Sequence, residues 1–287
     1  MLVEGRATLT SGVPVTTSDQ TGSTIYFTPC GGNNITLWDG SNWTNYTFSE
    51  VSVAVPATTN TAYDVFGYVS SSTLALDTPL AWTSSGYSSA AARATSLVVT
   101  DGVLTKSGAK SRLYLFSFMT GGTSGVVPDT ANDGTSAGGG QRYLFNMYNQ
   151  AQRHICQRDT TGGWSYTTGT WRQQRATSSN KFEIFVGQQG GLIDITNECW
   201  YYDSNGTCAA ACGIGVNSTS ANSSNSNNYA DIGVAGNNLL LAKLMQYPIL
   251  GYSYYCPLEI CKGGSPSFYG KLNSGEEQTG MTGILWC

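Results

Sequence analysis

The sequence predicts an all-β protein built from antiparallel β-sandwich or jelly-roll-like modules with very little helix. Short segments rich in Val, Ile, Thr, Tyr and Phe recur between turn clusters, and this is the pattern of strands. Long helical segments do not alternate with them, as they do in proteins with a parallel sheet. Of the 287 residues, 40 % are hydrophobic and 11 % aromatic, which is enough apolar surface to build a core.

The expected strands follow one another at short intervals along most of the chain. In order they are residues 6–10, 24–28, 34–38, 43–48, 51–55, 63–69, 74–76, 96–100, 112–119, 141–148, 181–186 and 192–196. Two Asp-Gly pairs, Asp39-Gly40 and Asp101-Gly102, separate strand segments. Asp-Gly tolerates the positive φ angles of a tight hairpin, so both pairs predict hairpin turns.

Residues 237–247 are the best candidate for a helix, because Leu240, Leu244 and Tyr247 have helical spacing. The same apolar run also fits a buried strand, and Pro248 ends either element. Glycines concentrate in residues 121–140, which predicts a surface loop or linker. The chain is therefore divided into an N-terminal β module (1–120), this tract (121–140) and a second β module with a Cys-rich C-terminal part (141–287).

Charge argues against nucleic acid as a partner, and the lengths of the apolar runs argue against a membrane-spanning helix. Only 11 % of residues are charged and the net charge is −4, whereas an ordinary soluble domain has about 25 % charged residues. Without a Lys/Arg cluster to meet phosphates, nucleic acid is not an expected partner. No apolar run approaches the roughly 18 residues of a membrane-spanning helix, and no secretion signal is expected at the N-terminus.

Six of the eight cysteines lie in the last third of the chain. They are Cys199, Cys208, Cys212, Cys256, Cys261 and Cys287. The spacings Cys208-x3-Cys212 and Cys256-x4-Cys261 are only loosely similar to a zinc site, so no metal and no cofactor are expected. Disulfides and buried free thiols remain as alternatives, and the sequence does not give the connectivity.

Catalysis is not expected. His154 is the only histidine, and no Gly-x-Ser-x-Gly elbow accompanies it. A glycan hydrolase would need paired carboxylates, for which Glu183, Asp194 and Glu198 are the candidates. Glu183 alternates with Phe182 and Ile184, as a solvent-facing strand residue does.

Aromatic residues are the candidates for ligand contact, since Trp and Tyr faces stack on sugar rings while Asn, Ser and Thr supply hydrogen bonds. Packing in the core is the competing interpretation for each of them. Trp43 and Tyr46 are an odd number of positions apart on one expected strand, so at least one is expected to point outward. Trp200, Tyr201 and Tyr202 lie in a turn-rich, cysteine-flanked stretch and are predicted to form an exposed cluster.

Several phrases, in order, resemble an uncharacterised module of virion structural proteins in tailed bacteriophages, of the tail-fibre or minor-tail-protein kind. They are GRATLTSGVPV (5–15), TIYFTP (24–29), LWDG (37–40), YDVF (63–66), RAT (93–95), DGVLTKSG (101–108), WSYTT (164–168) and WRQ (171–173). The resemblance covers roughly residues 5–190. It brings no catalytic residue set and does not extend to the cysteine-rich tail.

The resemblance implies a non-enzymatic virion protein, most simply a tail-fibre or receptor-binding subunit. Such a subunit assembles in the host cytoplasm, is exposed outside the cell on the particle, and contacts other virion proteins and a host surface glycan. Likeness to fibre proteins also implies a homotrimer. A capsid decoration (cement) protein is the first alternative, and a tailspike-like glycan depolymerase is the second.

Overall fold

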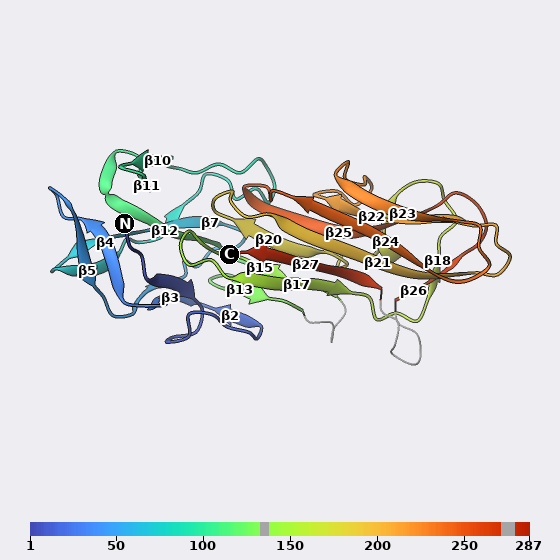
Figure 1. Ribbon diagram of the computed structural model, residues 1–287, viewed down its shortest axis with the longest axis horizontal. Coiled ribbons are helices and arrows are strands. Elements are labelled where there is room, and N and C mark those ends of the chain that lie inside the picture. The colour runs from blue at the N-terminus through green and yellow to red at the C-terminus, as the bar shows by residue number, and fades with distance from the viewer. Residues whose placement is uncertain (133–137, 271–278) are drawn as a thin grey trace.

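The computed structural model describes residues 1–132, 138–270 and 279–287. These residues form an elongated molecule of strands (Figure 1), with one short 3-10 turn, η1 (Gln174–Ala176). The all-β prediction is confirmed. No helix in the described ranges is long and apolar enough to cross a membrane.

Two sheets form the larger part of the molecule, and β23 joins them by pairing with both. The first sheet has the order β14 (Gly138–Gly139), β17 (Gln152–Arg158), β27 (Gly280–Trp286), β21 (Ile193–Asp203), β24 (Gly236–Gln246) and β23 (Ser226–Ile232). The second has the order β22 (Ala209–Val216), β25 (Gly251–Cys261), β20 (Phe182–Val186), β15 (Gln141–Arg142), β13 (Val127–Thr130) and β2 (Gln20–Gly22). The short strands β18 (Trp164–Ser165), β19 (Arg172–Gln173) and β26 (Ser267–Tyr269) extend them.

In the first sheet, the apolar residues that alternate along β21 and β24 lie on the buried face. In β21 the side chains of Ile193 and Ile195 are buried while Glu198 is exposed. In β24 Leu240 and Leu244 are buried in the same alternation. This region therefore forms a strand and not a helix, because the period of two places its apolar side chains on one sheet face.

The N-terminal part consists of smaller sheets at one end of the molecule (Figure 1). β1 (Gly5–Thr8), β3 (Thr24–Pro29) and β6 (Val51–Ala54) form one, and β4 (Asn34–Trp38) with β5 (Trp43–Thr47) forms a hairpin. A further sheet contains β10 (Leu97–Thr100), β11 (Val103–Lys106), β12 (Ala109–Met119), β7 (Ala62–Ser70), β8 (Thr73–Leu76), β9 (Leu80–Ala81) and β16 (Leu144–Asn146).

Both predicted hairpin turns are present. Asp39 Oδ1 accepts hydrogen bonds from the Ser41 and Asn42 amides, each 2.8 Å long, and the turn joins β4 to β5. Asp101 and Gly102 have φ angles of 52° and 84° and join β10 to β11. Two positive φ angles in succession are what Asp-Gly supplies in a tight hairpin.

Strand pairing crosses the boundary expected between the two modules. β16 pairs with β12, and β2 pairs with β13. Val127–Thr130 is therefore a strand with a buried Val127 rather than part of a surface linker. Residues 133–137 of the same tract lie outside the described residues. One hydrophobic core runs through both parts of the molecule.

Candidate functional site

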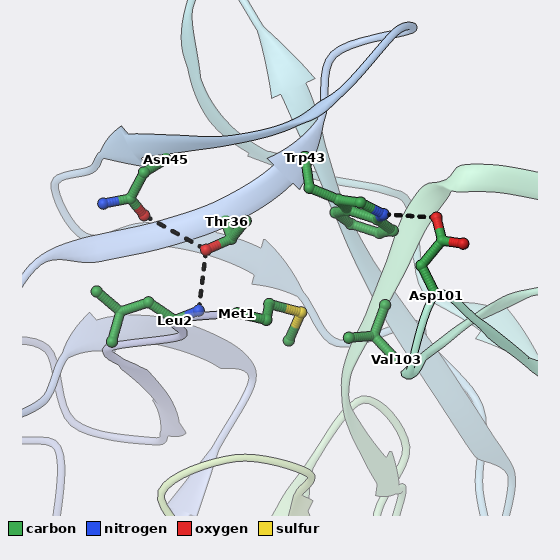
Figure 2. Close-up of a pocket in the computed structure, with 7 residues that line it drawn as sticks. All are labelled: Met1, Leu2, Thr36, Trp43, Asn45, Asp101 and Val103. Atoms are coloured by element: carbon green, nitrogen blue, oxygen red, sulfur yellow. Dashed lines mark hydrogen bonds between the residues drawn. The ribbon is translucent and has the colours of Figure 1, made fainter.

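The two hairpins and the start of the chain line an open pocket of about 470 Å³, called here the tip pocket (Figure 2). Its lining residues are Met1, Leu2, Thr36, Trp43, Asn45, Asp101 and Val103. The hairpin β4–β5 supplies Thr36, Trp43 and Asn45, and the hairpin β10–β11 supplies Asp101 and Val103. Both lie at the N-terminal end of the molecule (Figure 1).

The turns place the two central side chains. Trp43 is the first residue of β5, directly after the Asp39–Asn42 turn, and Asp101 lies in the turn of the second hairpin. The indole Nε1 of Trp43 donates a 2.9 Å hydrogen bond to Asp101 Oδ2 (Figure 2). This bond joins residues 58 positions apart and fixes the orientation of the Trp43 ring at the pocket wall.

Lys110 lies beside the tip pocket and forms an ion pair with Asp101. Its Nζ lies 2.6 Å from Asp101 Oδ2 and 3.4 Å from the centre of the Trp38 ring. The hydrogen bonds from Lys110 and then from Trp43 lower the pKa of Asp101, so the carboxylate stays ionised at neutral pH. Both contacts end on Oδ2, and Oδ1 points away from Trp43 (Figure 2).

Polar groups form the opposite edge of the tip pocket. Thr36 Oγ1 accepts a 2.9 Å hydrogen bond from the Leu2 amide and donates a 3.4 Å bond to Asn45 Oδ1 (Figure 2). Asn45 is exposed and Thr36 half-buried. The pocket thus combines an aromatic ring with hydroxyl, amide and carboxylate groups, which is the chemistry that binds a polyhydroxylated ring.

The other predicted glycan contacts are distributed differently. Tyr46 is half-buried against the core and does not line the tip pocket. Trp200, Tyr201 and Tyr202 lie within β21 and not in a turn. The prediction of one exposed cluster is wrong, because alternation places Tyr201 in the core with 0 % exposure while Tyr202 is 40 % exposed on the outer face.

A second groove, of about 350 Å³, is not among the sites that the sequence predicts. Three tyrosines line it: the Tyr87 and Tyr252 ring centres are 4.8 Å apart, and those of Tyr252 and Tyr254 are 6.5 Å apart. The strand pattern signals Tyr252 and Tyr254 on β25. No sequence signal brings Tyr87 to them, because the loop after β9 docks through a 2.8 Å hydrogen bond from the Tyr252 amide to Ser85 O.

Glu183 lies beside this tyrosine groove and is held by three side chains. Lys181 Nζ is 2.8 Å from Oε1, Gln141 Nε2 donates a 2.6 Å bond to Oε2, and the Tyr252 hydroxyl donates to Oε1. Burial acts to raise the pKa of Glu183, but the hydrogen bonds from Lys181, Tyr252 and Gln141 outweigh it and lower the pKa. The solvent-facing position that the alternation suggests for Glu183 is wrong, because its side chain is only 12 % exposed and anchors β20 to β25.

This arrangement predicts a pH dependence. Because the folded pKa of Glu183 is lowered from 4.5, its stabilisation should be present above pH 4.5 and lost as the pH falls through the folded pKa. Urea unfolding of the native chain and of Glu183→Gln from pH 7 to pH 3 measures this. The two free energies of unfolding should converge at low pH. A gap that stays constant across the range contradicts the prediction.

The candidate catalytic carboxylates are not brought together. Glu183 is on the second sheet, whereas Asp194 and Glu198 are on the outer face of β21 in the first sheet. Four residues along one strand separate side chains by about 13 Å, and Asp194 pairs with Lys243 at 3.3 Å. His154 lies on β17 opposite Ile284. Across the described ranges, no group of three or more His, Cys, Asp and Glu side chains is placed to hold a metal ion.

The six C-terminal cysteines are all buried. Cys256 donates to Ser218 O at 2.9 Å and Cys212 to Asn197 O at 3.6 Å. Burial raises the pKa of Cys256 to about 12 and raises that of Cys212 as well, so both are protonated at neutral pH. The Sγ atoms of Cys208 and Cys261 lie 3.0 Å apart.

No family model matches the chain, and no curated protein matches it. A chain in a structure of infectious bursal disease virus, Gx strain, aligns with 93 % of this chain and 74 % of its own length at 11 % identity, with a TM-score of 0.28. A chain in a structure of the Gt strain aligns with 100 % of this chain and 77 % of its own length at 9 % identity, with a TM-score of 0.25. The insecticidal delta-endotoxin Cry8Ea1 from Bacillus thuringiensis aligns over 99 % of this chain and 52 % of its own length, with 7 % identity and a TM-score of 0.25. TM-scores of this size do not define a shared fold.

Proposed function

We propose that this protein is a non-enzymatic virion structural subunit, of the tail-fibre or receptor-binding kind, that contacts a host surface glycan through the tip pocket. The observation that carries this proposal is the Trp43 ring, held by Asp101 in a pocket that Thr36 and Asn45 also line. The phage module that the sequence resembles supports the virion assignment.

The chemistry of the tip pocket suits a neutral sugar. An aromatic face packs against the apolar face of a sugar ring, while Asn45, Thr36 and the Asp101 carboxylate offer partners for its hydroxyls. The hydrogen bond to Asp101 already fixes the Trp43 side chain, so less side-chain entropy is lost when a ligand binds. A rigid aromatic side chain supplies contact area for a ligand at a low cost in side-chain conformational entropy.

The position of the tip pocket supports an end-on contact. The hairpins β4–β5 and β10–β11 lie at one end of the long axis, and the two-sheet sandwich forms the other end (Figure 1). Loops on a rigid scaffold are a common location for binding residues. A subunit attached to a particle through its sandwich would present these hairpins outward.

Replacing Trp43 with Ala is expected to weaken glycan binding at least 10-fold, about 1.4 kcal/mol, because the stacking face is lost. Purified native and variant chains are screened on an array of bacterial surface oligosaccharides, and the affinity for the best ligand is then measured by calorimetry. Tyr202→Ala is the matched control, since it removes an exposed aromatic from the outer face of β21 and should leave binding unchanged.

The opposite pattern, in which Tyr202→Ala abolishes binding and Trp43→Ala does not, moves the contact to the sheet face and contradicts the tip pocket. An array on which the native chain binds no oligosaccharide contradicts the glycan proposal itself. Immunogold labelling of intact particles distinguishes the appendage from a head protein: labelled tails support the proposal, and labelled heads favour the decoration protein instead.

A further inference from the structure

We propose that Cys208 and Cys261 form a disulfide bond that fastens the loop between β21 and β22 to the end of β25. Their Sγ atoms are 3.0 Å apart and both side chains are fully buried. The bonded distance is about 2.05 Å, so a small movement of the two side chains closes the bond. The inference is independent of the glycan contact.

Strand register places the two side chains on the same face. Cys261 is the last residue of β25 and lies opposite Ala210 of β22. Cys208 precedes Ala210 by two positions, and residues two apart on a strand share a face. The Lys262 amide also donates a 2.8 Å bond to Ala209 O, which continues the pairing past the end of β25. The continued pairing therefore brings both cysteines to the same interior face, diagonally across the two strands.

The backbone around Cys208 is held in place before any bond forms. Its amide donates a 2.7 Å hydrogen bond to Asp203 Oδ2, and its carbonyl accepts a 3.0 Å bond from the Gly233 amide. Gly264 packs so closely that a Cβ there would lie 3.0 Å from the Cys208 nitrogen. With the loop fixed on both sides, little conformational freedom is left to lose when the bond closes.

The other buried cysteines point to different partners. Cys256 and Cys212 each donate to a backbone carbonyl, of Ser218 and Asn197 respectively. Cys261 also donates to a carbonyl, Gly263 O at 2.7 Å, but contacts Cys208 Sγ as well. Cys212 Sγ lies 3.6 Å from Asn197 O, and Asn197 precedes Cys199 by two positions on the same face of β21. Cys199 and Cys212 are therefore the competing pair in any oxidation experiment. Cys208 and Cys261, in contrast, have their two Sγ atoms in direct contact.

Bond formation requires an oxidant, for which a small-molecule disulfide of the glutathione class is sufficient. One cysteine thiolate attacks that disulfide and releases one thiol, and the second cysteine then displaces the other half. The two protein thiols lose two protons and two electrons, and the oxidant is reduced to two thiols. The resulting bond closes a loop between residues 53 positions apart, and constraint of the unfolded chain over a loop of this length stabilises the fold.

The full chain is incubated with oxidised glutathione, alkylated under denaturing conditions, and digested without reductant for mass spectrometry. We expect one cross-linked peptide pair containing Cys208 and Cys261, with six of the eight cysteines alkylated. The midpoint of thermal unfolding should fall by roughly 5–10 °C when a reductant is added. Cys208→Ser should abolish both the cross-link and the reductant effect, while Cys256→Ser, on the same strand as Cys261, should keep both.

Eight alkylated cysteines after oxidation overturn the proposal, and so does a cross-link between Cys199 and Cys212 in place of the proposed one. Peptide mapping of the native chain decides the question even when a serine variant does not fold.

Discussion

Replacement of Asp129 by Ala is expected to lower the free energy of unfolding by about 3–5 kcal/mol, because it leaves two buried arginines without their counter-ion. Asp129 Oδ1 is 2.9 Å from Arg142 and Oδ2 is 3.0 Å from Arg153, and all three side chains are at most 8 % exposed. The Arg142 guanidinium also donates to His154 O at 2.6 Å. The cluster therefore ties β13 and β15 of the second sheet to β17 of the first.

Urea unfolding measures the loss. The control is Asp194→Ala, which breaks the ion pair with Lys243 on the outer face, where the two side chains are 38 % and 49 % exposed. Exposed pairs contribute at most about 1 kcal/mol, so this variant should unfold close to the native chain. Equal losses for the two variants would show that Asp129 does not hold the sheets together.

Loss of the Arg93 side chain should be comparably damaging, again about 3–5 kcal/mol. Arg93 Nε is 2.8 Å from Asp64 Oδ2, and its guanidinium lies 4.3 Å from the centre of the Trp82 ring. It also donates to Gly187 O, which follows β20. Because Asp64 is 1 % exposed, Arg93→Ala leaves a buried carboxylate without its cation and removes a hydrogen bond between the N-terminal part and the sandwich.

Arg93→Lys provides an internal comparison. It keeps the charge but loses the planar guanidinium that reaches Asp64 and Gly187 together. Its free energy of unfolding should therefore lie between those of the native chain and Arg93→Ala. Arg112→Ala is the matched control, since the Arg112–Asp77 pair is 31 % and 23 % exposed and should cost about 1 kcal/mol or less. If Arg93→Ala unfolds like Arg112→Ala, Arg93 is not a joint between the two parts.

The strands were predictable where hydrophobic alternation and turn chemistry agree. Residues 34–38 form β4 as expected, and both Asp-Gly hairpins are present because positive φ angles are local properties of the sequence. The strand within residues 121–140 was not predictable from the sequence. Glycines there indicate a loop, yet Val127–Thr130 pairs with β2, a strand more than 100 positions earlier in the chain, and only tertiary contacts determine that.

The tip pocket was predictable only in part. Composition and the strand period identified Trp43, but Asp101 and Lys110 reach it through hairpin packing that no local pattern encodes. Tyr201 was misplaced for a related reason, because the stretch around it reads as a turn while β21 continues to Asp203 and alternation buries its ring. In the tyrosine groove, the strand period relates Tyr252 to Tyr254 on β25, but no local signal places Tyr87, which depends on a docked loop.

The proposed function is binding without catalysis, and one measurement tests this directly. The purified chain is incubated with intact bacterial surface polysaccharide, and bound protein and newly formed chain ends are measured in the same sample. We expect saturable binding that Trp43→Ala weakens, with no increase in chain ends over time. Steady release of oligosaccharides by the native chain, abolished in Glu183→Gln, would contradict the account and identify the protein as a depolymerase.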